Sequence, residues 1–238
     1  MLTLSPLVRH SPAPAAIPAP KPLQNIRVMI DPGHGGVDGG CCQGDTLEKD
    51  INLAVGLALQ DELSTLGATV RLTRSSDAAL VPFGTKNRHK GDLSARITLT
   101  QEFASDIYIA LHANAGPAQL GGGLTFYRKD DAESRRLAAV IQDKLTLVVP
   151  GNQNGILPAR FMVLSALHIP AVLIEMGFIT SAADKERLIR PGAAYALAAA
   201  IAAGVRAFAA GEESAAPALS PFLAPAGDDP DELVSVGE

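Results

Sequence analysis

Short apolar runs alternate along the chain with longer segments in which apolar residues recur every three or four positions. Runs of the first kind are typical of buried strands, and segments of the second kind are typical of amphipathic helices. The predicted strands are residues 26–31, 68–74, 106–112, 122–128 and 171–178. The predicted helices are residues 48–66, 93–104, 131–147, 181–189 and 193–208. Residues 161–167 fit either a short strand or a helical turn.

This alternation predicts the fold class. Strands that are each followed by a helix form parallel pairs, because the helix carries the chain back to the starting edge of the sheet. Such crossovers place helices on both faces. We therefore expect an α/β protein with one domain, built on a twisted and mostly parallel sheet that is covered by helices on both faces.

Both terminal segments lack these periods. Residues 11–23, SPAPAAIPAPKPL, are rich in Pro and Ala, so residues 1–23 are predicted to be an extended N-terminal linker. Residues 212–238 are rich in Pro, Ala and acidic residues and are predicted to be a disordered tail. The compact domain is expected between them, at residues 24–211.

Charge and hydropathy argue against two kinds of partner, nucleic acid and a membrane that the chain would span. The formal net charge is −5, which argues against a nucleic-acid partner, because phosphate binding needs clustered Lys and Arg. No run of about 18 uncharged apolar residues is present, so no transmembrane segment is expected. The first ten residues, MLTLSPLVRH, also lack the basic start and the apolar core of a secretory signal.

Four residues with metal-binding or proton-transfer chemistry stand where one sheet edge would collect them. His34 follows the first strand, His112 ends the third and Glu175 lies late in the last, whereas Glu48 opens the first long helix. Open α/β sheets place ligands and chemistry at the carboxyl ends of their strands. The pattern therefore predicts a metallohydrolase site.

Each residue taken alone has a structural alternative. His34 lies in the glycine-rich segment DPGHGGVDGG, which could be a plain turn. Asp45 and Glu48 have the spacing of a capping box, which would serve only helix stability. His112 could be a core histidine bonded to a backbone carbonyl. The small polar neighbour Asn114 instead suits the floor of a cleft.

Glu175 is harder to explain structurally. It places a carboxylate inside the apolar run VLIEMGF, and an unpaired buried carboxylate is costly unless its pKa rises. A raised pKa suits a general base that later returns the proton as an acid. A salt bridge to Arg74 or Arg96 is the structural alternative.

The two adjacent cysteines offer a different chemistry. Cys41 or Cys42 could be a thiolate nucleophile paired with His34 or His112, or a softer zinc ligand. The segment VDGGCCQGD has no positive charge that would lower a thiol pKa, which argues against the nucleophile.

Two histidines and one glutamate are a known zinc ligand set with an open fourth position. We therefore predict one Zn²⁺ per chain, held by His34, Glu48 and His112. Zinc lowers the pKa of water to about 7 and polarises a carbonyl. Glu175 would take the proton of the attacking water and pass it to the leaving amine.

The segments IDPGHGGVDGG, LEKDINLA, RLTR, LSARI, ALHANA and AVLIEMGFIT, in this order, resemble the zinc-dependent N-acetylmuramoyl-L-alanine amidases of bacterial cell walls, the amidase-3 family. The resemblance covers about residues 26–209. It implies a sheet of about six strands and hydrolysis of the amide between N-acetylmuramic acid and L-alanine of the stem peptide.

Carried over residue by residue, the resemblance places the zinc ligands at His34, Glu48 and His112 and the catalytic glutamate at Glu175. Arg74, Arg96 and Asn114 are candidates for contacting substrate. The two arginines would either bind carboxylates of the stem peptide or orient the loops of the site. ALHANA departs slightly from the family's usual serine-containing form.

Residues 77–97, DAALVPFGTKNRHKGDLSARI, resemble the spore-cortex, germination-specific subgroup, which acts with a deacetylase to form muramic δ-lactam. The resemblance implies peptidoglycan as substrate and a cell-envelope location outside the cytoplasm. A protein activator or a deacetylase is the further partner that it suggests.

Two other functions remain open at this point. A non-enzymatic module that binds peptidoglycan, or activates another protein, would keep the fold but would lose a ligand or the glutamate, and all four residues are present here. An enzyme of the same chemistry could instead cleave a different amide of the stem peptide.

Overall fold

The computed structural model describes residues 21–214. Its strands are β1 (Arg27–Pro32), β2 (Cys42–Gln43), β3 (Thr46–Leu47), β4 (Thr69–Leu72), β5 (Ile107–Asn114), β6 (Leu124–Arg128), β7 (Gly155–Ala159) and β8 (Ala171–Phe178). Its helices are α1 (Glu48–Thr65), α2 (Arg88–Glu102), α3 (Ala132–Val148), α4 (Met162–Ala166), α5 (Ala182–Ile189) and α6 (Ala193–Ala209).

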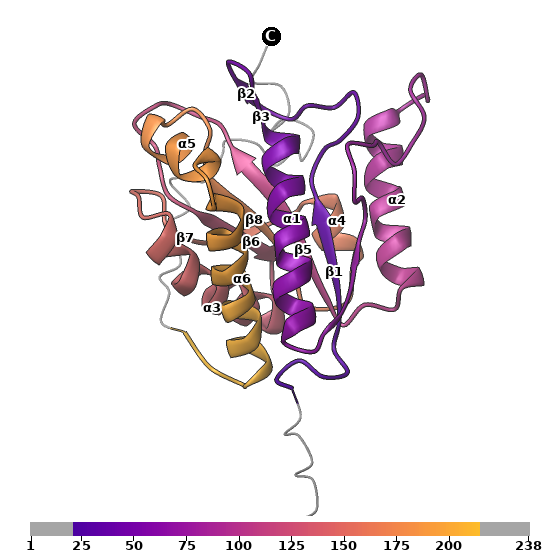
Figure 1. Cartoon of the computed structure of the whole chain (residues 1–238). Helices are drawn as coiled ribbons and strands as arrows, with labels where there is room; N and C mark the ends of the chain where they lie inside the picture. Colours follow the sequence, from indigo (N-terminus) through magenta and orange to yellow (C-terminus); the bar gives the residue numbers. More distant parts are fainter. Residues whose placement is uncertain (1–20, 215–238) are drawn as a thin grey trace, which may run out of the picture.

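Six strands form one sheet in the order β4-β1-β5-β8-β6-β7. Strands β4, β1, β5 and β8 are parallel to one another, and β6 joins β8 in the antiparallel direction and carries β7 parallel to itself. Strands β2 and β3 form a separate short hairpin above the start of α1 (Figure 1). The predicted single α/β domain with a mostly parallel sheet of about six strands is confirmed.

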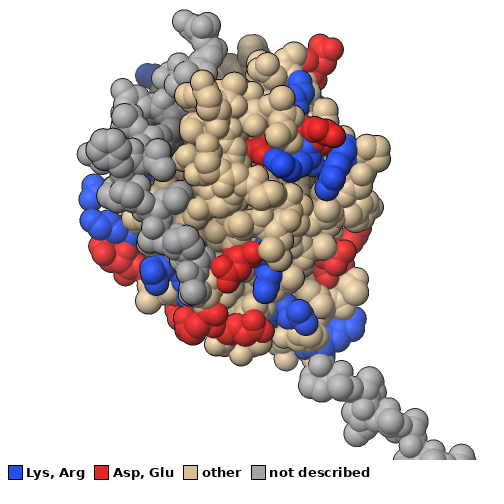
Figure 2. Space-filling model, turned by 90° about the vertical axis from the view of Figure 1, so that its left-hand side faces the viewer, with Lys and Arg blue, Asp and Glu red and all other residues tan. Residues whose placement is uncertain are grey.

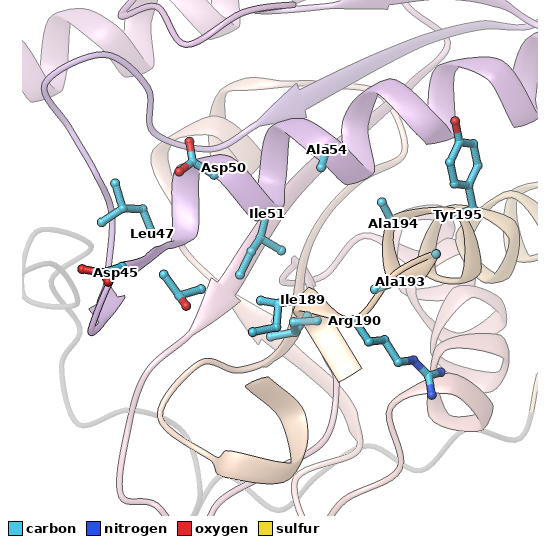
Figure 3. Close-up of a pocket in the computed structure, with 13 residues that line it drawn as sticks. Asp45, Leu47, Asp50, Ile51, Ala54, Ile189, Arg190, Ala193, Ala194 and Tyr195 are labelled. Carbon is cyan, nitrogen blue, oxygen red and sulfur yellow. The ribbon is translucent and has the colours of Figure 1, made fainter. Parts of the chain in front are cut away.

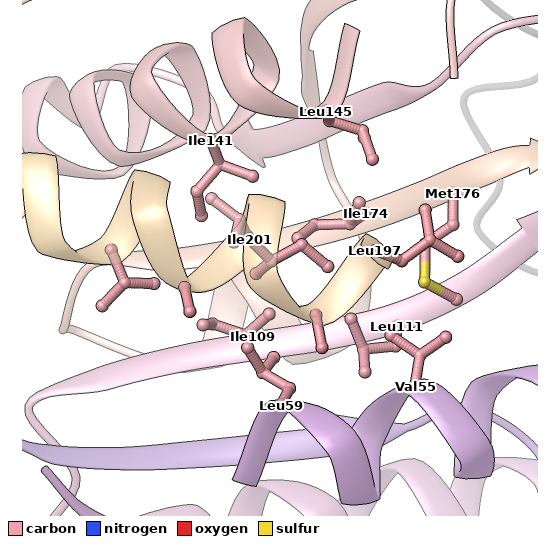
Figure 4. Close-up of a cluster of buried hydrophobic side chains, with 14 of the residues drawn as sticks. Val55, Leu59, Ile109, Leu111, Ile141, Leu145, Ile174, Met176, Leu197 and Ile201 are labelled. Atoms are coloured by element: carbon pink, nitrogen blue, oxygen red, sulfur yellow. The ribbon is translucent and has the colours of Figure 1, made fainter. Parts of the chain in front are cut away.

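Helices cover both faces of the sheet. On one face, α1, α3 and α6 enclose a large apolar core with the inward side chains of β5 and β8 (Figure 4). On the other face, α2 and α4 cover a smaller cluster around Met29, Tyr108 and Phe126. The buried alanine-rich helix α6 packs against α1 and α3 (Figure 1).

Several boundaries differ from the sequence-based ones. Strand β7 was not predicted, because Pro158 interrupts its apolar pattern; an edge strand tolerates such a proline, since one side needs no backbone donor. The hairpin strands β2 and β3 have two residues each, too few to show a period. Helix α2 begins at Arg88 rather than residue 93 because its first turn is polar. The ambiguous residues 161–167 contain helix α4.

The predicted linker and tail lie mostly outside the described residues. Leu23, the last residue assigned to the linker, is fully buried in the larger core cluster, so the packed structure includes it. Among residues 21–214, no single helix has the length and apolar composition needed to cross a membrane; α5 and α6 meet that requirement only as a pair bent by 90°.

Gly204 allows the close approach of α6 to α3. A Cβ atom at this position would lie 2.6 Å from the Cα of Ile141, which is backbone and cannot move aside like a side chain. Gly91 in α2 is a matched control, because a Cβ atom there would meet Val81 Cγ1 at an ordinary 3.6 Å.

Gly204→Ala is expected to lower the free energy of unfolding by about 1–3 kcal/mol through overpacking. Gly91→Ala is expected to raise it by about 0.4–1 kcal/mol, because alanine favours the helix. Urea denaturation of both variants measures this difference. Equal effects at the two positions would contradict the close α3–α6 contact.

Candidate functional site

His34, Glu48 and His112 converge at the carboxyl end of the parallel strands. One ligand atom from each lies within 4.8 Å of the others. His34 Nε2 is 3.1 Å from Glu48 Oε1, and His112 Nδ1 is 2.9 Å from the same oxygen. The two imidazole rings are 5.0 Å apart and nearly perpendicular. The structure therefore brings together the three residues that the sequence singled out as metal ligands.

The glycine-rich loop after β1 has to pass very close to the other two residues. His34 itself has a left-handed φ of 62°. A Cβ atom on Gly33 would lie 2.2 Å from Cε1 of His112, and one on Gly40 would lie 2.4 Å from Oε2 of Glu48. These glycines let the loop place the imidazole of His34 beside its partners, which argues against a plain turn.

Two buried arginines hold this loop in position. Arg74 donates from Nε to the carbonyl of Pro32 at 2.9 Å and from Nη2 to the carbonyl of Gly33 at 2.8 Å. Arg96 donates to the carbonyls of Pro32 at 3.1 Å and His34 at 3.0 Å. Arg74 is 4% exposed and Arg96 is 2% exposed. Of the two roles that the sequence left open for these arginines, this burial favours orienting the loop over contacting substrate.

Arg96 is itself fixed by two carboxylates. It forms ion pairs with Asp31, at the end of β1, and with Asp92, one turn earlier on α2. Asp31 also accepts hydrogen bonds from Thr73 and Tyr108. Burial raises the pKa of Asp31, but the charge of Arg96 and these hydrogen bonds outweigh it, so the pKa is lowered. A buried ionic network therefore ties α2 to the loop that holds His34.

Glu48 is held by backbone and side-chain donors. Its Oε2 accepts from the N–H of Cys41 at 2.9 Å, and its Oε1 accepts from the N–H of Ala113 and from Nδ2 of Asn52, both at 3.2 Å. Glu48 is the first residue of α1, after the N-cap Leu47, which makes no side-chain cap. The capping-box alternative is therefore wrong.

The cluster favours a positive charge at its centre. Burial opposes ionisation of Glu48, but the contacts with His112 and His34 outweigh it and hold the pKa of this carboxyl well below its usual range. Burial likewise lowers the pKa of His34, whereas its contacts with Asp38 and Glu48 raise it to about 10. His34 Nδ1 lies 3.0 Å from Asp38 Oδ1, so a second carboxylate orients this ring.

Asp38 was not singled out in the sequence. Its position four residues after His34, in the same glycine-rich loop, is the signal that could have identified it. Histidines that bind metals commonly donate their second ring N–H to a carboxylate.

Glu175 lies on β8 directly across from His112 on β5. Its Oε2 is buried and has no hydrogen-bond partner among the described residues. Burial, followed by the charge of Glu48, raises the pKa of the Glu175 carboxyl well above its usual range, and His34 opposes this weakly. The hydrogen bonds of Arg74 and Arg96 go to other groups, so neither forms the salt bridge considered as an alternative.

The remaining candidate residues have different surroundings. Cys41 donates its thiol hydrogen to the carbonyl of Ala113 at 3.1 Å, and burial followed by the charge of Glu48 raises its pKa, which disfavours a thiolate nucleophile. Cys42 is exposed. Asn114 lies at the end of β5, partly buried, where its Oδ1 accepts from the N–H of Ala115; direct substrate contact by Asn114 stays a prediction.

A cavity of about 440 Å³ lies next to this end of α1 but on another face of the helix (Figure 3). Asp50, Ile51 and Ala54 line it from α1, and Ile189 and Tyr195 line it from the region of α5 and α6. None of the three clustered residues contributes to its lining, so we assign the chemistry to the cluster at the sheet edge.

Comparison with known proteins agrees with this geometry. Residues 28–207 match the family model described as N-acetylmuramoyl-L-alanine amidase. The germination-specific N-acetylmuramoyl-L-alanine amidase of Bacillus subtilis is 36% identical over 178 residues, which cover 71% of this chain and 74% of that protein. The amidase LytC of the same organism is 32% identical over 170 residues, covering 70% of this chain and 32% of LytC.

Solved structures show the same fold. The CwlD amidase of Clostridioides difficile, in complex with the GerS lipoprotein, superposes with a TM-score of 0.75 and 30% identity, covering 79% of this chain and 100% of that one. The amidase AmiC2 of Nostoc punctiforme gives a TM-score of 0.67 with 28% identity, covering 77% of this chain and 96% of that one.

Fold and site thus define an α/β protein that carries a histidine–glutamate–histidine cluster at the carboxyl end of its parallel strands. The chain belongs to the N-acetylmuramoyl-L-alanine amidase family. It is accordingly a peptidoglycan hydrolase that acts on the amide between N-acetylmuramic acid and L-alanine.

Gly33→Ala tests the close packing of the loop against His112. The new Cβ atom would overlap the imidazole, so we expect the ring to shift and metal affinity to fall about 10–100-fold, as for other changes that misorient a ligand. Titration with zinc against a chromophoric chelator measures the affinity.

Gly39→Ala is the matched control in the same loop. A Cβ atom at Gly39 would meet only Leu47 Cδ2, at 3.8 Å, so zinc affinity is expected to stay within twofold of the wild type. Equal losses in the two variants would show that loop flexibility matters rather than the contact with His112.

Proposed function

We propose that the amidase reaction of this chain depends on one zinc ion held by His34, Glu48 and His112, with Glu175 as the group that moves the proton. The observation that carries the proposal concerns the buried Oε2 of Glu175. It has no hydrogen-bond partner within residues 21–214, and Glu175 lies directly across from the ligand candidate His112. A structural glutamate would need a partner at this depth.

The donor set fits zinc. Tetrahedral zinc sites use imidazole nitrogens and carboxylate oxygens at about 2.0–2.2 Å, which places ligand atoms about 3.4 Å from each other. The contacts of His34 and His112 with Glu48, at 3.1 and 2.9 Å, approach that spacing. Three protein ligands leave one position for water or substrate, as catalytic zinc sites require. When bound, zinc polarises the scissile carbonyl and makes water easier to deprotonate.

The protein supplies orientation and proton transfer. Asp38 fixes the ring of His34, and Asn52 with two backbone N–H groups fixes the carboxylate of Glu48. Glu175 would accept a proton from the attacking water at its free Oε2 and then donate it to the amine of L-alanine as the amide bond breaks. The raised pKa of Glu175 suits both directions of transfer.

No observation favours the inactive binding module as the alternative. Such a module would be expected to lack one of the four residues, and all four are present and lie together. The structure gives no geometric reason to prefer a different amide of the stem peptide.

The relatives also suggest where the chain acts and with what. We propose that it works outside the cytoplasm, on the cell wall or the spore cortex, since relatives include a germination-specific amidase and probable cell wall amidases. A protein partner is part of the proposal, because CwlD was solved with the GerS lipoprotein. A spore-cortex role with a deacetylase, leading to muramic δ-lactam, is the most specific form of the proposal.

Glu175→Gln removes the proton-accepting group without changing its size. We expect zinc content and thermal stability to be retained and kcat to fall by about 10²–10⁴. Mass spectrometry of digested peptidoglycan, counting released stem peptides, measures turnover and identifies the bond cleaved. Glu102→Gln, at an exposed position in α2, is the control and should retain wild-type activity. Normal turnover by Glu175→Gln would remove this residue from the mechanism.

Metal removal tests the ligand assignment. Chelation should abolish activity, and added zinc should restore it in the wild-type protein. His34→Ala and His112→Ala should bind less than one zinc per chain under conditions in which the wild type binds one. His89→Ala, in the first turn of α2 and outside the cluster, is the control and should bind one. Full zinc occupancy in His34→Ala would overturn the assignment.

A further inference from the structure

The segment between β4 and α2 rises from the same edge of the sheet as the metal cluster. Its base is fastened to the loop that holds His34, because Asp77 accepts from the N–H of Gly36 at 2.7 Å and from Nζ of Lys49 at 2.8 Å. Further along, the N–H of Leu80 donates to Asp92 at 3.0 Å, which ties the segment to α2. These hydrogen bonds hold the segment, residues 73–87, beside the metal cluster.

The outer part of this segment, around residues 82–85, exposes apolar side chains to solvent. Phe83 is 84% exposed, the highest value among the exposed large apolar residues described. Thr85 closes a turn onto the carbonyl of Pro82 through its hydroxyl at 2.7 Å, which keeps Phe83 at the outer end. On the neighbouring metal-site loop, Val37 is 61% exposed. Single exposed apolar residues are common, but these two lie on loops that are joined by the hydrogen bond between Gly36 and Asp77.

The residues that follow Thr85 carry positive charge. Residues 86–90, KNRHK, contain three Lys or Arg residues and no acid. Within the described residues, the side chains of Lys86 and Lys90 are exposed and have no hydrogen bond or ion pair, whereas Arg88 is partly buried and its charge acts on Asp38. These cations stand at the start of α2, where the helix dipole already makes the potential positive and no acidic residue lies in the first turn.

Arg88 connects this charge with the metal site. Burial raises the pKa of Asp38, but the contact with His34, the hydrogen bond from the N–H of Gly40 and, last, the charge of Arg88 lower it to about 2. Arg88, Asp92 and Arg96 follow one another at intervals of four residues and so share one face of α2, and Arg96 donates from this face to the carbonyl of His34 at 3.0 Å. By contrast, the face that carries α3, α5 and α6 shows Lys and Arg interspersed with Asp and Glu (Figure 2). An unbalanced cluster of cations at the rim of the site suggests an anionic occupant.

We propose that Val37, Phe83, Lys86, Arg88 and Lys90, here called the cationic rim, bind the peptidoglycan polymer beyond the bond that is cleaved. The cations would face carboxylates of neighbouring stem peptides, and Phe83 would pack against apolar faces of the glycan. This proposal rests on the proposed function, which supplies the substrate. The rim adjoins the metal site through the Asp77 contacts, so a polymer lying in the site would extend across it.

A substrate with repeated carboxylates would bind the cationic rim more tightly than a substrate with one. A single exposed charge pair contributes little, on the order of 0.2–1 kcal/mol. A polymer that carries many carboxylates engages several cations at once, and the local concentration of the next stem peptide then increases overall binding. The rim should therefore matter for polymeric peptidoglycan and much less for one short muropeptide.

The test compares two charge-reversal variants of the full chain. Lys86→Glu/Lys90→Glu alters the rim, and Phe83→Ser is a second rim variant that leaves the charge unchanged. Lys129→Glu/Arg160→Glu is the control with the same change in net charge; both residues are exposed and follow β6 and β7, which end on the opposite side of the sheet because β6 runs antiparallel to β8. Arg88 is left intact because it shares a face of α2 with Arg96, which holds the loop that carries His34.

Two readouts are needed. Binding to insoluble peptidoglycan is measured in the Glu175→Gln background at low and high ionic strength. We expect Lys86→Glu/Lys90→Glu to weaken binding at least about fivefold at low ionic strength and to reduce its salt dependence, with the control within twofold of the parent. In catalytically active protein, the increase in KM for peptidoglycan should exceed that for a short soluble muropeptide at least about fivefold.

Equal binding by rim variants and control would overturn the proposal. Equal losses on polymer and on muropeptide would also overturn it, since the effect would then act through the metal site. Should the wild-type protein cleave neither substrate, the proposed function fails, whereas the binding comparison still decides the role of the rim.

Discussion

The site depends on the clamp that two buried arginines place on the backbone of residues 32–34. Arg74 and Arg96 together bind the carbonyls of Pro32, Gly33 and His34. A glycine-rich loop has high conformational entropy, and His34 adopts a left-handed φ that is unfavourable for a residue with a side chain. The hydrogen bonds of the two arginines offset both costs, the loss of loop entropy and the unfavourable φ of His34. Because Arg96 is buried with Asp31 and Asp92, loss of one partner would leave an uncompensated charge, at a cost of about 3–5 kcal/mol.

The parallel sheet positions Glu175 relative to His112. His112 and Glu175 are direct neighbours in the register of β5 and β8, so one pair of strands sets the distance between the ligand candidate and the proposed proton-transfer group. A shift of register by one residue would turn one of these side chains to the other face of the sheet. The core that packs α1, α3 and α6 against the sheet is what resists such a shift, and it also places Glu48 at the start of α1.

Much of this arrangement could be predicted from the sequence. The apolar runs ending near His34 and His112 identify parallel strands, and the edge at which such strands end identifies the residues that converge. For Arg74 and Arg96 the sequence left two roles open, because it does not show whether a guanidinium group faces substrate or backbone carbonyls. Strand β7 lacked an apolar period because of Pro158, and Asp38 was missed because its role depends on the path of the loop.

The central claim is that one zinc ion is bound by His34, Glu48 and His112 and faces Glu175. X-ray absorption at the zinc edge of the loaded protein, together with anomalous diffraction from its crystals, tests this most directly. The account predicts one zinc per chain with two imidazole nitrogens and a carboxylate oxygen at about 2.0–2.2 Å, no sulfur ligand, and the Glu175 carboxyl near the metal but not bound to it. Zinc bound elsewhere, or held by a sulfur of Cys41 or Cys42 at about 2.3 Å, would contradict it.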